Sequence, residues 1–361
     1  MSSDAGPEPG LPRWRQDWGE PVREATLDPQ RRIIDPHHHL WPWREATPMS
    51  PAGPYLGPEL LKDARGGHNV VATVAIECGV AYRPELGPDL ASAGETAFVA
   101  AEARALERAC AGLRVAGFVA HIDLRSGDDV RRRIAAHRKA GGRLLKGVRQ
   151  MAAWAPDAPI NISPIAGDLY ADPGFRAGVR AAAAEGLVID VWHYHTQGED
   201  FAALARACPE AVFVVDHYGT PLGVGPYAGR KEQVFAEWAR GIELAAACPN
   251  VLFKASGFAL AMTGADFIAR PAQPASEDVA AWAEPYFSHL LKVAGAERCM
   301  FASNFPIEKT CVAYGVLYNA FKRLAQALPE ADADSLFFEV AKSTYRLALD
   351  SVDAAPRPGL A

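Results

Sequence analysis

The sequence of 361 residues lacks features that mark several classes of protein. It has no uninterrupted apolar run of about 18 residues, so we expect no transmembrane helix. Residues 1–30 lack the apolar core of a signal peptide, and the six cysteines are scattered without a C-x-x-C pair, which favours reduced thiols and a cytoplasmic protein. The formal net charge of −6 argues against a nucleic-acid partner.

What the sequence does contain is an ordinary globular composition, 49% hydrophobic and 22% charged, with a regular alternation of two kinds of segment. Short β-branched, apolar runs recur eight times and alternate with alanine-rich helical stretches. The expected strands are Arg32–Asp35, Val70–Glu77, Arg114–Leu124, Leu144–Arg149, Leu187–Trp192, Val212–Asp216, Val251–Ala255 and Cys299–Ser303. The expected helices include Glu95–Ala111, Asp129–Ala140, Pro173–Glu185, Lys231–Ala247, Glu277–Ala294, Tyr314–Ala327 and Ala333–Leu349.

Strands that alternate with helices indicate parallel βαβ units, and eight units predict an α/β fold of the (β/α)8 TIM barrel type. A doubly wound sheet is the alternative, which the strand count disfavours. We expect an N-terminal arm over residues 1–30, a barrel over 31–350 with long loops at its C-terminal face, and a flexible tail over 351–361. Trp14 and Trp18 are expected to pin the arm either to the body of the protein or to a partner subunit. Because the arm has no core of its own, we expect it to pack across a neighbouring barrel in a homodimer.

The first strand runs into a cluster of three histidines, in the stretch Ile33–Trp41. Successive side chains of a strand point to opposite faces, so His37 and His39 share one face and His38 lies on the other. Two imidazoles on one face can serve a single metal ion or a single substrate.

Polar residues also end the other strands, and a barrel brings all its strand ends together at one mouth, where active sites are built. In chain order these residues are Glu77, His121, Asp123, Arg149, His193, His195, Asp216, His217, Lys254 and Asn304.

Charged residues in otherwise apolar strands need partners. The planar fork of Arg149 suits a carboxylate, and together with Lys254 it indicates a small anionic substrate. Glu77 either moves a proton or pairs structurally with one of these cations. Trp154 lies in the long loop after the fourth strand and is a candidate for an apolar wall.

Four motifs, in this order, resemble signatures of the amidohydrolase-related family, a branch of the amidohydrolase superfamily that contains lactonases and, more distantly, metal-dependent decarboxylases. They are Asp35–Trp41, Gly147–Arg149, Asp216–Gly219 and Met300–Pro306, and the resemblance covers roughly residues 31–348.

The resemblance implies that two strand-1 histidines, a strand-5 histidine and a strand-8 aspartate surround the metal or the attacked carbonyl. The histidines carry over to His37, His39 and His195, with His193 as a rival for the last place. His217 matches a strand-6 histidine that contacts metal or substrate. Zinc or manganese suits such ligands, although lactonases of this kind can work without a tightly held metal.

The sequence departs from the family pattern at strand 8, where Asn304 stands in place of the common aspartate. An amide has no basic site and is a weak neutral ligand, so another group must activate water or the reaction needs no carboxylate there. His195, His217 and Glu77 are the available bases.

Lys146, also in the fourth strand, raises a further alternative. In binuclear amidohydrolases a carbamylated lysine there bridges two metals. Lys146 faces the opposite way from Arg149, however, and the rest of a binuclear ligand set is uncertain.

These observations predict a hydrolase that opens a lactone, or cleaves a related C–O or C–N bond, in a small carboxylated substrate. The alternatives are a non-oxidative, metal-dependent decarboxylase and a carboxylate-binding barrel that lost catalysis with the aspartate. The predicted metal ligands are His37, His39 and His195. The predicted substrate-binding residues are Arg149, Lys254, His193 and Trp154, and the predicted catalytic residues are His195, His217, Asn304 and Glu77.

Overall fold

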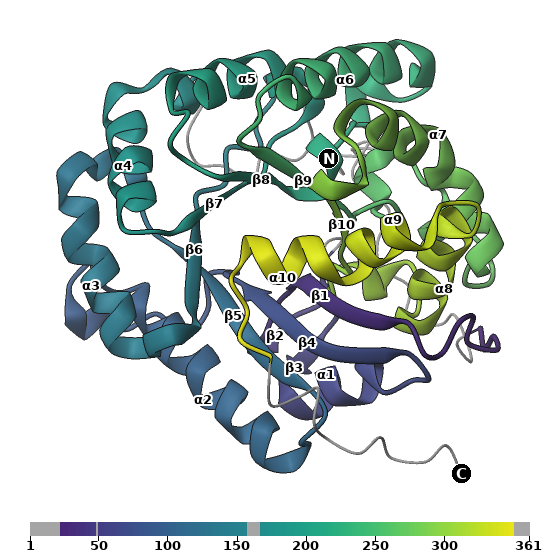
Figure 1. Cartoon of the computed structure of the whole chain (residues 1–361), viewed down its shortest axis with the longest axis horizontal. Helices are drawn as coiled ribbons and strands as arrows, with labels where there is room; N and C mark the ends of the chain where they lie inside the picture. Colours follow the sequence, from purple (N-terminus) through teal and green to yellow (C-terminus); the bar gives the residue numbers. More distant parts are fainter. Residues whose placement is uncertain (1–21, 48–49, 157–166, 350–361) are drawn as a thin grey trace, which may run out of the picture.

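The computed structural model describes residues 22–47, 50–156 and 167–349, and in this part of the chain eight parallel strands form a barrel surrounded by helices (Figure 1). The expected (β/α)8 fold is confirmed. In barrel order the strands are β1 (Arg32–His38), β4 (Asn69–Ile76), β5 (Arg114–His121), β6 (Leu145–Arg149), β7 (Val188–Val191), β8 (Phe213–Val215), β9 (Val251–Ala255) and β10 (Cys299–Phe301).

The ring closes where the chain leaves β10 and passes the end of β1. The Asn304 backbone N–H donates to the His37 carbonyl at 2.7 Å, and the His39 N–H donates to the Phe305 carbonyl at 2.7 Å. These bonds satisfy the backbone groups at the barrel seam. They also hold the His-x-His segment next to Asn304 at the mouth of the barrel.

Helices follow the strands and pack their apolar faces on the outside of the barrel. In α4, for example, the Asp172 side chain caps the helix by accepting from the Phe175 N–H at 2.6 Å, and Pro173 starts the first turn. These outer helices are α1 (Gly57–Ala64), α2 (Ala93–Ala109), α3 (Val130–Gly141), α4 (Pro173–Ala184), α5 (Gly198–Ala207), α6 (Lys231–Ala246), α7 (Ser276–Ala294) and α8 (Tyr314–Ala325).

The C-terminal segment covers the N-terminal end of the barrel. Its helical part consists of α9 (Glu330–Asp334), a π-helical turn (Ser335–Glu339) and α10 (Val340–Thr344), so the expected single helix Ala333–Leu349 is interrupted and ends early. Interior strand side chains form one apolar cluster with Phe338, Val340, Tyr345, Leu347 and Leu349. This packing explains why a segment without a long helix stays ordered there.

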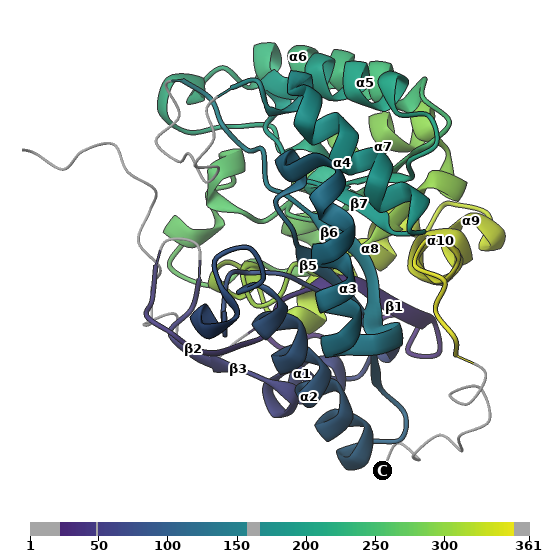
Figure 2. The same cartoon turned by 90° about the vertical axis from the view of Figure 1, so that its left-hand side faces the viewer.

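A short hairpin between β1 and α1 was not predicted. It pairs β2 (Trp41–Arg44) with β3 (Gly53–Tyr55), and the buried Trp41 ties it together by donating to the Gly53 carbonyl at 2.9 Å. Figure 2 shows the hairpin on the side of the molecule opposite α9 and α10, which is the side of the barrel mouth. Strands of four and three residues are too short to show a clear periodicity.

The described part of the predicted arm lies on its own barrel. The Glu24 carboxylate accepts from the Ser276 N–H of α7 at 2.7 Å, and Lys322 of α8 donates to the Leu27 carbonyl at 2.8 Å. The acceptors and donors that hold residues 24–28 therefore come from the same chain. Residues 1–21, with both tryptophans, and the tail 351–361 lie outside the described residues, and the homodimer stays a prediction.

All six cysteines are free thiols. Within residues 22–47, 50–156 and 167–349, no helix combines the length and apolar character that a membrane span requires.

Candidate active site

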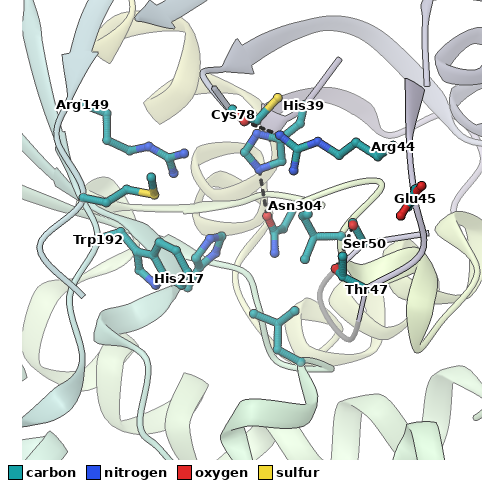
Figure 3. Close-up of a pocket in the computed structure, with 13 residues that line it drawn as sticks. His39, Arg44, Glu45, Thr47, Ser50, Cys78, Arg149, Trp192, His217 and Asn304 are labelled. Carbon is teal, nitrogen blue, oxygen red and sulfur yellow. Dashed lines mark hydrogen bonds between the residues drawn. The ribbon is translucent and has the colours of Figure 1, made fainter. Parts of the chain in front are cut away.

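A cavity of about 390 Å³ opens at the mouth of the barrel, between the strand ends and the hairpin (Figure 3). Four residues predicted for the site line it: His39, Arg149, His217 and Asn304. The hairpin segment adds Arg44, Glu45, Thr47 and Ser50, and apolar contacts come from Met151, Trp192, Leu260 and Ile307.

The His-x-His motif has the alternation that the sequence predicts. The rings of His37 and His39 meet edge to face with centroids 5.0 Å apart. His38 points elsewhere, with its Nε2 2.9 Å from the Thr73 hydroxyl of β4. His37 and His39 therefore belong to one cluster, and His38 has a structural contact.

His39 presents a lone pair to the cavity. Its Nδ1 lies 3.0 Å from the Ile76 carbonyl, which can only accept, so Nδ1 carries the proton and Nε2 does not. Nε2 lies 3.3 Å from the side-chain oxygen of Asn304, which is an acceptor. Because an imidazole lone pair needs a donor, we assign the flipped amide, in which the Asn304 NH2 group faces His39. Its second N–H then remains for a ligand.

His37 lies fully buried behind this wall. Its Nδ1 is 3.2 Å from the Asp216 carboxylate and 3.2 Å from the Lys254 ammonium, and its Nε2 has no partner among the described residues. Its ring centroid lies 4.6 Å from that of His217. Burial, opposed in part by Asp216, holds the pKa of His37 well below its usual value, so the ring is neutral.

His217 is held in position by the segments that follow β8 and β9. Its backbone is left-handed, with φ of 52°, which is uncommon for a residue with a side chain. The Ser256 hydroxyl lies 2.9 Å from Nδ1, which leaves Nε2 for the cavity. A Cβ at Gly257 would come within 2.9 Å of the His217 Cβ, so glycine is required there. Burial lowers the pKa of His217 to about 3.

Arg149 spans the interior side of the cavity, and its charge is compensated. Its Nε donates to the Glu77 carboxylate at 2.8 Å, one terminal nitrogen donates to the Glu77 carbonyl at 2.8 Å, and the other donates to Asp216 at 3.0 Å. All three side chains are at most 3% exposed. Burial alone would raise the pKa of Asp216, but Lys254, His37 and Arg149 lower it far below its usual value, so its carboxylate is ionised.

Lys254 belongs to the same interior network and not to the cavity wall. It is 0% exposed, and its ammonium forms salt bridges with Asp190 and with Asp216, the latter at 3.0 Å. The Tyr345 hydroxyl of the C-terminal segment donates to Asp190 at 2.9 Å. Burial raises the pKa of Asp190 to about 6, although Lys254 opposes the shift. This differs from the expectation that Lys254 binds substrate, because both of its carboxylate partners are already present.

His193 and His195 also lie outside the cavity wall. His193 Nδ1 is 3.0 Å from the Tyr170 hydroxyl, and His195 Nε2 is 3.5 Å from the Glu237 carboxylate of α6. His195 therefore does not join His37 and His39 as a third ligand, contrary to the expected set. The reason is local, because β7 ends at Val191 and the two-residue alternation stops before both histidines.

The positions and contacts of three further residues bear on the roles predicted for them. Glu77 is engaged by Arg149, which is the structural alternative, and it does not line the cavity. Trp154 lies in its loop outside the cavity wall and half-buried. Lys146 Nζ donates to the Arg346 carbonyl at 3.2 Å, so no part of the cavity is built on it.

Arg44, the last residue of β2, was not predicted from the sequence. Its guanidinium donates to the Cys78 carbonyl and lies over the Trp41 ring, 4.7 Å from the centroid. The Cys78 thiol lines the same wall, and burial raises its pKa well above the usual value, which disfavours the thiolate. The only signal in the sequence was an arginine five residues after His39.

The donor set does not fit a resident metal ion. Among the residues that the structure describes, no group of three or more histidine, cysteine, aspartate or glutamate side chains is arranged to hold one. The ionised carboxylate closest to the histidines, Asp216, is bound by Arg149 and Lys254. At strand 8 the site offers only the neutral amide of Asn304.

Comparisons with known proteins agree with the fold and the motifs. The family model described as Amidohydrolase matches residues 34–347. The uncharacterized protein y4mH of Sinorhizobium fredii is 28% identical over 334 residues, which cover 87% of this chain and 98% of that protein.

Two crystal structures of an amidohydrolase from Burkholderia multivorans, one with bound HEPES and one with bound zinc, have a TM-score of 0.67 to this chain. They share 26% and 24% identity, and each match covers 88% of this chain and 99% of theirs. A Pseudomonas putida structure provisionally designated a 2-pyrone-4,6-dicarboxylic acid hydrolase has a TM-score of 0.54 at 20% identity, covering 87% and 97%. The chain belongs to the amidohydrolase family.

Proposed function

We propose that the protein is a hydrolase that opens the ring of a small carboxylated lactone, or cleaves a related C–O or C–N bond, at the barrel mouth. The observation that carries the proposal is the cavity itself. It combines a neutral imidazole, His217, with hydrogen-bond donors from Arg149 and Asn304. A base and a set of oxyanion donors on one cavity are what acyl transfer to water requires.

The donors would polarise the carbonyl under attack. A guanidinium has five N–H groups, and three of those of Arg149 are bound to Glu77 and Asp216. The remaining two, with the second N–H of Asn304, bind the carbonyl oxygen as it becomes an oxyanion. Both side chains are at most 3% exposed, so these donors act where water competes little.

His217 would move the proton. Its Nε2 takes a proton from the attacking water while Ser256 holds Nδ1, and the oxygen of that water bonds to the carbonyl carbon. The ring C–O bond then breaks, and the imidazolium returns the proton to the leaving alkoxide. The ionised Asp216 favours the transient imidazolium, because it is the charge that raises the pKa of His217. The product is a hydroxy acid.

No step of this proposal passes through a metal ion. Enzymes of the amidohydrolase superfamily typically depend on a divalent metal, and a relative of this chain was crystallised with zinc. The described donors here do not form such a centre. We therefore expect exhaustive chelation, checked by elemental analysis, to leave turnover unchanged. A loss of turnover that zinc or manganese restores would overturn this part of the proposal.

The test of the function is a panel of small lactones and carboxylic acids, with proton release and carbon dioxide measured on the same samples. We expect proton release without carbon dioxide, and loss of at least 10²-fold in kcat with His217→Asn, by analogy with other general bases. His121→Asn is the matched control, because His121 is half-buried at the end of β5 and outside the cavity wall. Carbon dioxide release would indicate the decarboxylase, and tight binding without turnover would indicate a non-catalytic barrel.

A further inference from the structure

We propose that Arg44 of the β2–β3 hairpin binds the carboxylate of the substrate, and that the cavity takes a lactone with one carboxylate group. The lactone part of this statement rests on the proposed function, whereas the carboxylate subsite rests on the geometry and charge of Arg44 alone.

The two arginines of the cavity stand on opposite walls. Figure 3 shows Arg149 and Arg44 pointing into the same space from opposite sides, with His39 and Asn304 between them. A substrate that places an anionic group on Arg44 therefore extends past His39 and Asn304 toward Arg149. One end of the substrate then contacts the charge of Arg44, and the other end contacts the oxyanion donors of Arg149 and Asn304.

The charges of the two arginines are balanced differently. Arg149 has Glu77 and Asp216 as partners, and Lys254 has Asp190 and Asp216. Arg44 is held by the Cys78 carbonyl and the face of Trp41, and it forms no salt bridge within the described residues. Among the described residues of the wall, Arg44 is therefore the cation without a carboxylate partner. A ligand can supply that carboxylate.

The other residues of the wall limit the ligand to one carboxylate group. Trp192, Leu260 and Ile307 are apolar and suit the carbon skeleton of a ring. A second carboxylate would lie on these side chains without a hydrogen bond, or near the ionised Asp216, and both placements are unfavourable. Thr47 and Ser50, beside Arg44, supply hydroxyls that a singly charged, oxygen-rich ligand can use.

Two substitutions with opposite expected effects on kcat/KM test the carboxylate subsite. Arg44→Gln keeps a hydrogen-bonding side chain and removes the charge, so kcat/KM for a monocarboxylated lactone should fall by about 10²-fold. The matched neutral lactone should change by less than about 3-fold. Glu45, its neighbour in the wall, opposes an anion. Glu45→Gln should therefore raise kcat/KM for the carboxylated lactone by about 2-fold.

The kinetic experiment compares a five-membered lactone with none, one or two carboxylate groups on the wild type and these variants. Arg44→Lys, which retains the charge, should keep most of the preference for the monocarboxylate. Arg83→Gln is the control, because Arg83 is an exposed arginine paired with Glu85 outside the cavity. Equal losses on the neutral and the carboxylated lactone, or a preference for the dicarboxylate, would overturn the proposal.

A binding measurement separates this subsite from the hydrolase proposal. Tetrahydrofuran-2-carboxylate has the ring and the carboxylate but no carbonyl to hydrolyse. By calorimetry it should bind the wild type and bind Arg44→Gln at least 10-fold more weakly. That result supports the subsite even if no lactone is turned over. Unchanged binding in Arg44→Gln would overturn it even if lactones are hydrolysed.

Discussion

Two regions of the molecule present an arginine to the same cavity, and they differ in how its charge is balanced. Arg149 comes from the barrel strand β6, and its partners Glu77 and Asp216, which follow β4 and β8, lie within 3.0 Å of it. Arg44 comes from the hairpin, where a backbone carbonyl and an aromatic face hold it. Buried strand charges carry the cost of desolvation and need partners from the protein itself. The half-buried charge of Arg44, at the end of β2, keeps part of its hydration and can bind a ligand.

The largest effect should come from removing the shared partner in the interior. Asp216→Asn leaves Arg149 and Lys254 each with one carboxylate fewer, and it removes the acceptor near His37. We expect the free energy of unfolding to fall by about 3–5 kcal/mol, as for other broken buried ion pairs, and kcat/KM to fall by more than about 10³-fold. Urea denaturation and steady-state kinetics measure the two effects.

The hairpin arginine should behave differently in the same denaturation experiment. Arg44→Gln should change the free energy of unfolding by less than about 1 kcal/mol, because no buried carboxylate is left unpaired. Equal destabilisation of Asp216→Asn and Arg44→Gln would contradict the distinction between a structural interior and a ligand-binding wall.

The pH dependence of kcat/KM tests the protonation state of His217 in the cavity. Burial lowers the pKa of His217 to about 3, and a histidine acts as a base only above its pKa. The acid limb of kcat/KM should therefore lie below pH 5. An imidazole with the ordinary pKa near 6.5 would instead cost about 30-fold between pH 8 and pH 5. A profile of that second kind would contradict the buried, neutral state of His217.

A separate effect, on the pH dependence of stability, concerns a buried carboxylate that forms no salt bridge with the described residues. Glu308 lies near the mouth, accepts from the Ala259 N–H at 3.2 Å, and burial raises its pKa to about 8. With a folded pKa above the unfolded value, its contribution to stability is full below about pH 4.5 and is lost as pH rises through 8. Glu308→Gln should remove a slope of up to about 1.4 kcal/mol per pH unit in that window. Thermal unfolding between pH 5 and pH 8.5 measures it, and an unchanged slope would show that Glu308 is ionised in the fold.

The barrel could be predicted from the sequence because its strands have a clear pattern of apolar residues. Stretches such as Asn69–Ile76 are β-branched, buried and separated by amphipathic helices, so local pattern and tertiary packing agree. The His-x-His cluster and Asn304 were placed correctly at the mouth for the same reason, since they end strands β1 and β10.

The partners inside the barrel were harder to predict, because they are set by which strands are neighbours and how far each strand extends. Asp190 stands alone in an apolar strand, yet its pairing with Lys254 depends on contacts across the barrel. His195 was assigned to the metal cluster by the family resemblance, from its place after the fifth strand, but the extended strand ends at Val191. Arg44 lies in a strand of four residues, where no periodicity can be read.

The most direct test of the account is the substitution Asn304→Asp, with kcat/KM for a carboxylated lactone and metal content measured on the same chelated sample. The site consists of neutral histidines and an amide that donates to the lone pair of His39. A carboxylate at that position removes the donor and adds a negative charge near an anionic substrate. We predict a fall of about 10²-fold or more, as for the loss of one oxyanion donor, with no stoichiometric metal. Higher activity together with tighter metal binding would contradict the account.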